Sequence, residues 1–323
     1  MHFGIEQREE RMTNDLELFD LHCDTPSELY RNVTALDSNP HHVSLNDASA
    51  FRRYTQVMAV FTPRSMNDES GFRHFHKTAD YLMFELERLC DRVTYVKNNR
   101  AFESADTQAR VFLAVEDARI LNGVRDRLTT LHARGVRFLT PVWGGESCIG
   151  GAHDTSVGLT EFGKQTIEDC FALGIVPDIS HASEKTADDV LEIAAKHQKP
   201  VVATHSASYT VNPHTRNLRD TQFEAVKKGG GLVGLCLYHA HLSNRGEADI
   251  SDVIAHIEHY FSLGGEDTVA FGSDFDGADL PTGISHPSDL IKVADELARL
   301  NYSDESIRKL FYKNAYNFLE KNL

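Results

Sequence analysis

The chain has 323 residues, of which 41% are apolar and 25% are charged, an ordinary globular composition. Its 33 basic and 48 acidic side chains leave a net charge of −15, and no basic run could follow a phosphate backbone. Nucleic acid and anionic membrane surfaces are therefore excluded as partners. The first residues lack the apolar stretch of a secretory signal, and no run approaches the roughly 18 apolar residues of a membrane span, so we expect a cytoplasmic protein.

Short apolar runs rich in β-branched residues alternate with helical patterns along the chain. This alternation predicts βα units around a parallel sheet. The predicted strands, in chain order, are 16–24, 55–63, 109–117, 135–143, 174–181, 200–206, 231–238 and 268–277.

Helical patterns separate these strands. The predicted helices are 70–93, 118–133, 160–173, 183–197, 220–229, 248–264, 287–299 and 304–321. Thr160 and Ser183 are N-cap residue types with acidic residues in the turn that follows, and Gly174 and Gly264 stand where two helices should end.

Eight strands alternating with helices, without a linker to mark a boundary, favour one (β/α)8 TIM-barrel domain spanning residues 1–323. We expect residues 1–15 to be a flexible N-terminal extension. Residues 25–54 are irregular and could form a lid or an interface. A doubly wound open sheet is the alternative, but the first strand–helix junction, HCDTPSELY, has neither GxGxxG nor a P-loop.

The ends of the predicted strands carry chemically useful side chains. In a (β/α)8 barrel the active site lies at the carboxyl ends of the strands. Five of the eight predicted strands end in Asp, Glu or His. These residues are His22, Asp24, Glu116, His181, His205 and Asp274.

Their spacing and type indicate a metal centre. His22 and Asp24 are two positions apart, so on a strand both point to one face, although such a pair could also simply bond loop backbone. Glu116 ends the apolar run VFLAV, where it needs cations or hydrogen-bond donors. Imidazoles and carboxylates are Zn²⁺ ligands, and five ligands are too many for one tetrahedral ion. Two ions sharing one carboxylate are therefore expected.

Six sequence blocks then carry a family resemblance over nearly the whole chain. They are FDLHCDTPSEL, AVED, GLTEFGKQTIEDCFALGIVPDISHAS, ATHSAS, HTRNLRD and FGSDFDG. In this order they resemble the renal or membrane dipeptidase family, zinc peptidases on a (β/α)8 barrel. The resemblance implies two zinc ions per chain. It places His22 and Asp24 on the first ion, His181 and His205 on the second, and Glu116 between them as a bridging, catalytic carboxylate.

The same resemblance implies an activity and two further roles. The activity is hydrolysis of dipeptides with a free C-terminal carboxylate, by a hydroxide that bridges the two zinc ions. Asp274 would handle the proton, and Arg216 would hold the substrate carboxylate. From the residues alone, Arg216 could equally be a solvated surface arginine and Asp274 a turn residue. Asp276 and Gly277 are interpreted as turn residues, and His239 and His241 are left out of the metal set.

The chain departs from the family pattern at the end of the fourth predicted strand. Many members carry a histidine there that bonds the substrate carbonyl, and Trp143 occupies the aligned position. An indole N–H only donates and is bulkier, so His153 is a candidate to supply that contact. We expect both residues to line the substrate site and the substrate range to be narrow.

Two other functions remain open at this point. The first is a barrel metallohydrolase of another amide, a lactam or an ester, although many such enzymes carry HxH rather than HCD on their first strand. The second is a non-catalytic homologue that binds peptide or metal, which only the change at Trp143 favours. A homodimer is one expectation for the assembly.

Overall fold

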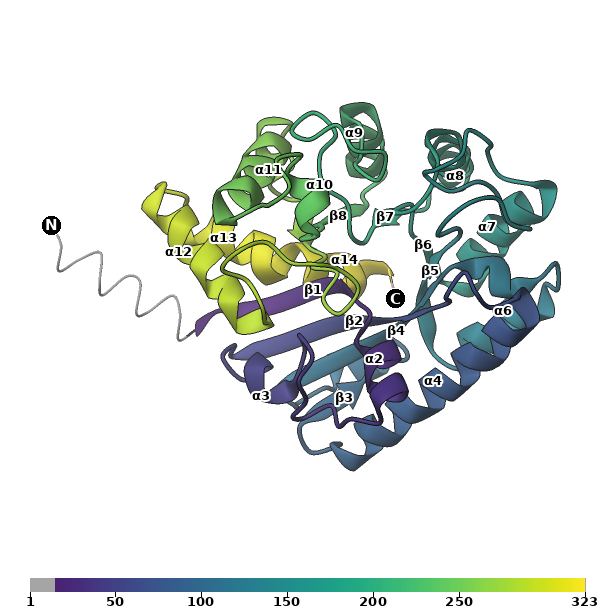
Figure 1. Cartoon of the computed structure of the whole chain (residues 1–323), viewed down its shortest axis with the longest axis horizontal. Coiled ribbons are helices and arrows are strands. Elements are labelled where there is room, and N and C mark those ends of the chain that lie inside the picture. Colours follow the sequence, from purple (N-terminus) through teal and green to yellow (C-terminus); the bar gives the residue numbers. More distant parts are fainter. Residues whose placement is uncertain (1–14, 323) are drawn as a thin grey trace, which may run out of the picture.

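The computed structural model describes residues 15–322, so nearly all of the predicted extension 1–15 lies outside the described residues. Within them, nine parallel strands form the centre of the molecule and helices lie around the outside (Figure 1). The strands are β1 (Glu17–Cys23), β2 (Arg53–Phe61), β3 (Val93–Tyr95), β4 (Ala109–Glu116), β5 (Val136–Thr140), β6 (Val176–Pro177), β7 (Val202–Ala203), β8 (Leu232–Leu235) and β9 (Val269–Phe271).

Eight of these strands follow one another around a barrel, in the order β6-β5-β4-β2-β1-β9-β8-β7. The ring closes between β6 and β7 through a parallel bridge that joins Asp178 to Val202. At this seam the Ile179 N–H donates to the Val202 carbonyl at 2.9 Å. All eight predicted strands are present, so the predicted (β/α)8 barrel is confirmed and the open-sheet alternative is wrong.

The two sides of the barrel differ in strand length. Strands β1, β2, β4 and β5 have 7, 9, 8 and 5 residues and form what we call the long-strand half. Strands β6 to β9 have 2, 2, 4 and 3 residues and form the short-strand half. The additional strand β3 pairs with β4 outside the barrel order and was not predicted, because three residues are too few to show a strand pattern.

Helices connect the strands and cover the barrel (Figure 1). The α-helices are α2 (Thr25–Asn32), α3 (Leu45–Ala48), α4 (Asp68–Arg88), α5 (Asn99–Glu103), α6 (Asp126–Ala133), α7 (Glu161–Leu173), α8 (Glu184–His197), α9 (Asp220–Lys228), α10 (His239–Leu242), α11 (Ile250–Ser262), α12 (Ile291–Arg299), α13 (Asp304–Arg308) and α14 (Asn314–Asn322). Short 3-10 helices span Ala118–Leu121 and Pro287–Leu290, and a π-helical turn spans Lys309–Lys313.

The predicted caps are present. Thr160 and Ser183 each accept the backbone N–H three residues ahead at 2.9 Å, which begins α7 and α8. Gly174 ends α7 with φ +73°, and Gly264, with φ +71°, follows the last turn of α11.

Three predicted segments differ from the structure. The helix expected over 118–133 is interrupted because Asn122 and Gly123 have φ of 48° and 73°, which ends the first turn. The helix expected over 304–321 is three successive pieces around the π-helical turn. Residues 25–54 contain the helices α2 and α3 rather than only irregular chain.

The core has two layers, which β4 illustrates. Alternate residues of this strand point to opposite faces. Phe112 packs inside the barrel against Phe19 and Phe138, whereas Val111 and Leu113 belong to the layer between barrel and helices. Tyr312 reaches the inner cluster and accepts from Arg110 near the start of β4, so the C-terminal segment covers the end of the barrel opposite the strand carboxyl ends.

None of the helices in residues 15–322 is long and apolar enough to cross a bilayer.

Candidate metal centre

The predicted site residues converge at the carboxyl ends of the barrel strands. His22 lies within β1 and Glu116 ends β4, while His181, His205 and Asp274 follow β6, β7 and β9. A cavity of about 640 Å³ lies at these strand ends. Of the predicted residues, those that line this cavity are Asp24, Glu116, Trp143, His153, His181, Arg216 and Asp274, and His22 and His205 are buried beside them.

One group of possible ligands is formed by His22, Asp24 and Glu116, whose ligand atoms lie within 4.8 Å of one another. The His22 Nε2 atom is 3.8 Å from Asp24 Oδ2 and 3.7 Å from Glu116 Oε2. Ligands around a tetrahedral zinc ion, each at about 2.0–2.1 Å, are roughly 3.3 Å apart. These side chains therefore need only small shifts to hold one ion.

A second group contains Glu116, His181 and His205. The His181 Nε2 atom lies 2.9 Å from both Glu116 Oε1 and His205 Nε2, and His205 Nε2 lies 3.5 Å from Glu116 Oε1. Since Glu116 belongs to both groups through different oxygens, it can bridge two ions. The structure thus brings together the five residues that the family resemblance assigns to two ions.

Several buried polar atoms in the two groups lack a conventional partner. Among the described residues, His22 Nε2, Asp24 Oδ1 and Glu116 Oε2 have no hydrogen bond. The His181 Nδ1 atom lies 3.1 Å from the Trp143 carbonyl and so carries its proton, which leaves its Nε2 lone pair facing His205. Unpaired buried acceptors are costly unless a cation engages them, so the donor set fits divalent metal ions.

The pKa shifts of the side chains in the centre also indicate that a cation would be stabilised there. Burial and the neighbouring Asp24 charge raise the pKa of Glu116 to about 8. Burial lowers the pKa of His22, but the carboxylates of Glu116 and Asp24 outweigh burial and raise this pKa well above its ordinary value. Burial keeps the pKa of His181 and His205 well below the ordinary value, so both imidazoles are neutral, the form that binds metals.

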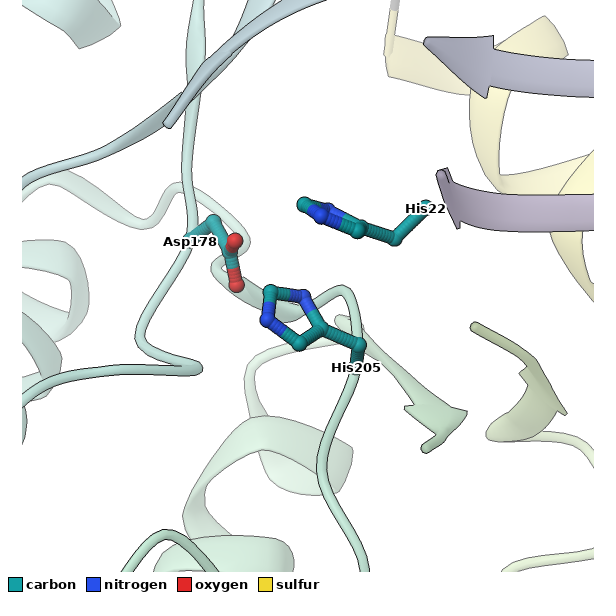
Figure 2. Close-up of side chains that lie close together, drawn as sticks. All are labelled: His22, Asp178 and His205. Carbon is teal, nitrogen blue, oxygen red and sulfur yellow. The ribbon is translucent and has the colours of Figure 1, made fainter. Parts of the chain in front are cut away.

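Asp178 is a buried carboxylate near the centre that the sequence reasoning missed. Figure 2 shows its side chain beside the rings of His22 and His205, and the ligand atoms of these three residues also lie within 4.8 Å of one another. It lies inside the apolar run GIVPDISH, and a charged residue there was the available signal. A charged residue in an apolar run, the pattern that identified Glu116, would have identified Asp178 as well.

Arg216 is buried, so the alternative of a solvated surface arginine is wrong. Its side chain is 5% exposed and lines the cavity. The Nη2 atom donates to the His205 carbonyl at 3.5 Å, whereas Nη1 has no hydrogen-bond partner among the described residues. A buried guanidinium with a free N–H group beside the metal ligands can bind an anion that enters the cavity.

The loop after β9 holds Asp274 in a constrained backbone. Asp274 and Asp276 have φ of 63° and 68°, in the left-handed region that favours glycine. Burial raises the pKa of Asp274 to about 7, and its Oδ1 atom lies 3.9 Å from His22 Nε2. A Cβ atom on Gly277 would lie 2.2 Å from Asp24 Oδ2 and 2.6 Å from Asp274 Oδ1, so any other residue here would displace one or both carboxylates.

Trp143 and His153 both border the cavity, as predicted. The Trp143 ring lies 4.9 Å from that of Phe61 and 5.7 Å from that of His181. His153 Nδ1 lies 3.0 Å from Thr215 Oγ1, and burial lowers the pKa of His153 to about 4, so its ring is neutral. The cavity lining therefore includes both an apolar indole and a neutral imidazole.

Comparison with known proteins identifies the family. The family described as membrane dipeptidase (peptidase family M19) matches residues 6–322. The chain belongs to the membrane dipeptidase family. The resemblance drawn from the six sequence blocks is thus confirmed, as is the expected enzyme class, a metallo-dipeptidase among the hydrolases.

Several individual proteins are similar to this membrane dipeptidase family member. A metallo peptidase from Rhodobacter sphaeroides, liganded with a phosphinate mimic of the dipeptide L-Ala-D-Ala, is 27% identical with a TM-score of 0.88, covering 96% of this chain and all of its own. Dipeptidase AC is 28% identical with a TM-score of 0.88, covering 95% and 98%. An uncharacterized protein in the pqqA 5′ region of Klebsiella pneumoniae is 33% identical over 218 residues, 64% of this chain and 79% of its own.

Proposed function

We propose that this enzyme hydrolyses dipeptides with a free C-terminal carboxylate at a centre that holds two zinc ions. The observation that carries the proposal is the sharing of Glu116 by two groups of ligands, His22 with Asp24 and His181 with His205. Each group offers the imidazole nitrogens and carboxylate oxygens that zinc takes in proteins. No thiolate contributes to either group.

The described side chains divide the chemistry between them. Bound zinc ions would acidify water and polarise the scissile carbonyl. Asp274 sits beside the first group, and its raised pKa lets this carboxyl accept and release a proton near neutral pH. Asp274 therefore takes the proton from the attacking water and gives it to the leaving amine, while Glu116 keeps the two groups at a fixed separation.

Arg216 is proposed to select substrates by their C-terminus. Arg216 lines the cavity and its Nη1 atom has no partner among the described residues, so we propose that its guanidinium forks onto a free carboxylate. Because the guanidinium is buried at a fixed distance from the ligand groups, a longer peptide cannot present both its scissile bond and its C-terminus. The proposal therefore restricts the enzyme to short peptides.

Aromatic and apolar residues also line the cavity. Tyr30, Phe61, Pro63, Met66 and Trp143 line it, and we call these residues the apolar wall. The cavity, of about 640 Å³, is large enough for a dipeptide. We propose that the apolar wall contacts the side chain of the N-terminal residue and that bulky Trp143 narrows the accepted range. A D-configured C-terminal residue, as in the mimic bound by the R. sphaeroides peptidase, is included in this proposal.

Two other activities compete with this one. A hydrolase of another amide, a lactam or an ester would use the same ligand groups but would not need Arg216. A homologue that binds peptide or metal without turnover would show zinc uptake and no product. The first would retain activity on substrates without a carboxylate, and the second would give no burst of product in a single turnover.

The deciding experiment measures metal content and activity on one preparation. We expect about two zinc ions per chain, activity on a panel of L,L- and L,D-dipeptides, and loss of activity after chelation with recovery on adding Zn²⁺. Trp143→His should widen the set of dipeptides that are cleaved. Metal content near zero after gentle purification, or equal activity on dipeptides and their C-terminal amides, would contradict the proposal.

Three further expectations stay predictions: the cytoplasmic location, the homodimer, and the single domain that spans the whole chain.

A further inference from the structure

We propose that Thr204 and Asp178 form a positioning pair that orients one imidazole of each metal-ligand group. Thr204 follows β7, and Asp178 follows β6 and takes part in the bridge that closes the barrel. Both side chains are 1% exposed. The inference rests on the proposed metal function and adds two residues that are not ligands themselves.

The carboxylate of Asp178 is fully occupied by uncharged donors. Its Oδ1 atom accepts from Ser180 N–H at 3.0 Å, from Ser180 Oγ at 2.5 Å and from Thr204 N–H at 2.8 Å. Its Oδ2 atom accepts from Thr140 Oγ1 at 2.6 Å and from Thr204 Oγ1 at 2.7 Å. With five hydrogen bonds on two oxygens, Asp178 has little capacity left to bind a metal ion. It is suited to hold neighbouring side chains in place.

The hydroxyl of Thr204, held by Asp178, contacts two histidines. It has one hydrogen, which it donates to Asp178, so its lone pairs must accept other contacts. The His205 Nδ1 atom lies 2.9 Å from this oxygen, and the His22 Nδ1 atom lies 3.4 Å from it. In the neutral form that binds a metal ion, both rings therefore carry their proton on Nδ1, which leaves the Nε2 lone pair for the metal.

The third imidazole is oriented independently. His181 donates its Nδ1 proton to the Trp143 carbonyl at 3.1 Å, a contact with backbone rather than with Thr204. His22 belongs to the first ligand group and His205 to the second. Since one hydroxyl contacts both rings, loss of that hydroxyl should weaken both metal sites together. The loss of an ordinary ligand from one group would weaken mainly one site.

A rival explanation is that Asp178 is itself a ligand, together with His22 and His205. The distances among these three residues allow it. The two explanations differ in what Thr204 does. A ligand role for Asp178 does not require the Thr204 hydroxyl, whereas the positioning pair does.

The test compares Thr204→Val, Thr204→Ser and Asp178→Asn with the wild type. Valine keeps the β-branched shape and removes the hydroxyl, and serine restores the hydroxyl. Thr140→Val is the matched control, because it removes one hydrogen bond to Asp178 without touching an imidazole. Zn²⁺ affinity and stoichiometry are measured by competition with a chromophoric chelator. The ring N–H proton signals of the zinc-loaded proteins report the Nδ1 contacts, and thermal unfolding of the metal-free proteins checks their folding.

We expect Thr204→Val to lower the affinity of both zinc ions about 10- to 100-fold, with the ring N–H signals of His22 and His205 shifted or exchanging faster. Asp178→Asn should also weaken both ions, and Thr204→Ser and Thr140→Val should remain close to wild type. Unchanged affinity and ring signals in Thr204→Val would overturn the positioning pair. Loss of binding in Asp178→Asn but not in Thr204→Val would overturn it in favour of a ligand role.

The outcomes also separate this inference from the proposed function. Wild-type protein that takes up no Zn²⁺ would overturn both. Wild-type protein that binds two zinc ions, alongside a Thr204→Val variant that binds them equally well, would overturn the positioning pair alone.

Discussion

The long-strand half and the short-strand half of the barrel hold their parts of the metal centre by different means. His22 and Glu116 lie within long strands, and β2 and β4 pair over eight residues up to Glu116 itself. His181, His205 and Asp274 lie beyond the ends of strands of two or three residues. Side-chain hydrogen bonds hold this second set, among them those of Asp178.

The comparison separates stability from site geometry. Where backbone ladders fix a ligand, the position of its backbone follows from the fold, although a side chain such as Thr204 can still orient its ring. Where the ladder is short, individual polar side chains also fix the position of the ligand. Substitutions of polar residues at the short strand ends should therefore mainly change chemistry and binding, and substitutions of core residues in the long-strand half should mainly change the free energy of unfolding.

The largest expected effect belongs to Asp274 in the short-strand half. Asp274→Asn removes the group proposed to move the proton but leaves the five ligands, so kcat should fall about 10²- to 10⁴-fold. Zinc content, measured on the same sample, should stay near that of the wild type. Turnover retained at the wild-type rate would show that another group carries the proton.

The next effect tests the long-strand half. Phe112 is fully buried on β4, with its ring 5.9 Å from that of Phe19. Phe112→Ala should lower the free energy of unfolding by about 3–5 kcal/mol in urea titrations while the zinc affinity of the folded protein changes little. Phe84→Ala is the matched control, because Phe84 is 60% exposed and its loss should cost less than about 0.5 kcal/mol. A large drop in zinc affinity in Phe112→Ala would contradict the expectation that core substitutions in the long-strand half affect stability rather than metal binding.

Arg216→Met tests whether the short-strand half selects substrates by their carboxylate. The variant loses the buried guanidinium, so kcat/KM for dipeptides should fall about 10- to 100-fold, as expected for hydrogen bonds to a charged group. Activity on dipeptide amides, already low in the wild type, should be little affected. If both substrates lost activity in the same proportion, Arg216 would act on folding or on the metals rather than on the carboxylate.

The smallest effect is a pH dependence of stability, again on the short-strand side. His256 on α11 accepts from the Ser208 N–H at 3.0 Å, and its Nε2 atom lies 3.1 Å from the Leu242 carbonyl, so the neutral ring satisfies both. Burial lowers the pKa of His256 to about 4, below the ordinary value of 6.5. The stability that this residue contributes is complete above pH 6.5 and is lost as the pH falls towards 4, because the unfolded chain then binds the extra proton.

The measurement is the free energy of unfolding of the metal-free protein across this range. In His256→Gln the slope should be shallower by about 1.4 kcal/mol per pH unit, the value for one proton. An unchanged slope would mean that other groups set the acid sensitivity.

Much of the fold could be predicted from the sequence, because its strands are apolar runs and its helices carry recognisable caps. Thr160 and Ser183 begin helices where expected. The exceptions have local causes: β3 is too short to show alternation, and the left-handed residues Asn122 and Gly123 interrupt an otherwise continuous pattern.

The site was only partly predictable, for a different reason. Ligands such as Glu116 stand out because a charged residue ends an apolar run. The burial of Arg216 and the contact of Thr204 with His22 depend on segments far apart in the chain, and a threonine at a strand end attracts no attention by type. That contact becomes visible only when the ends of β1 and β7 are brought together in space.

The residues that line the cavity differ in how well they should tolerate substitution, and Gly277 should tolerate it least. Any larger residue at position 277 would push against Asp24 and Asp274 at once, so Gly277 should not be varied. The residues of the apolar wall already carry large side chains and none has a positive φ, so other side chains can replace them without a backbone constraint. A library designed to shift the enzyme towards new peptides should therefore randomise positions such as Phe61, Met66 and Trp143 and leave the loop after β9 unchanged.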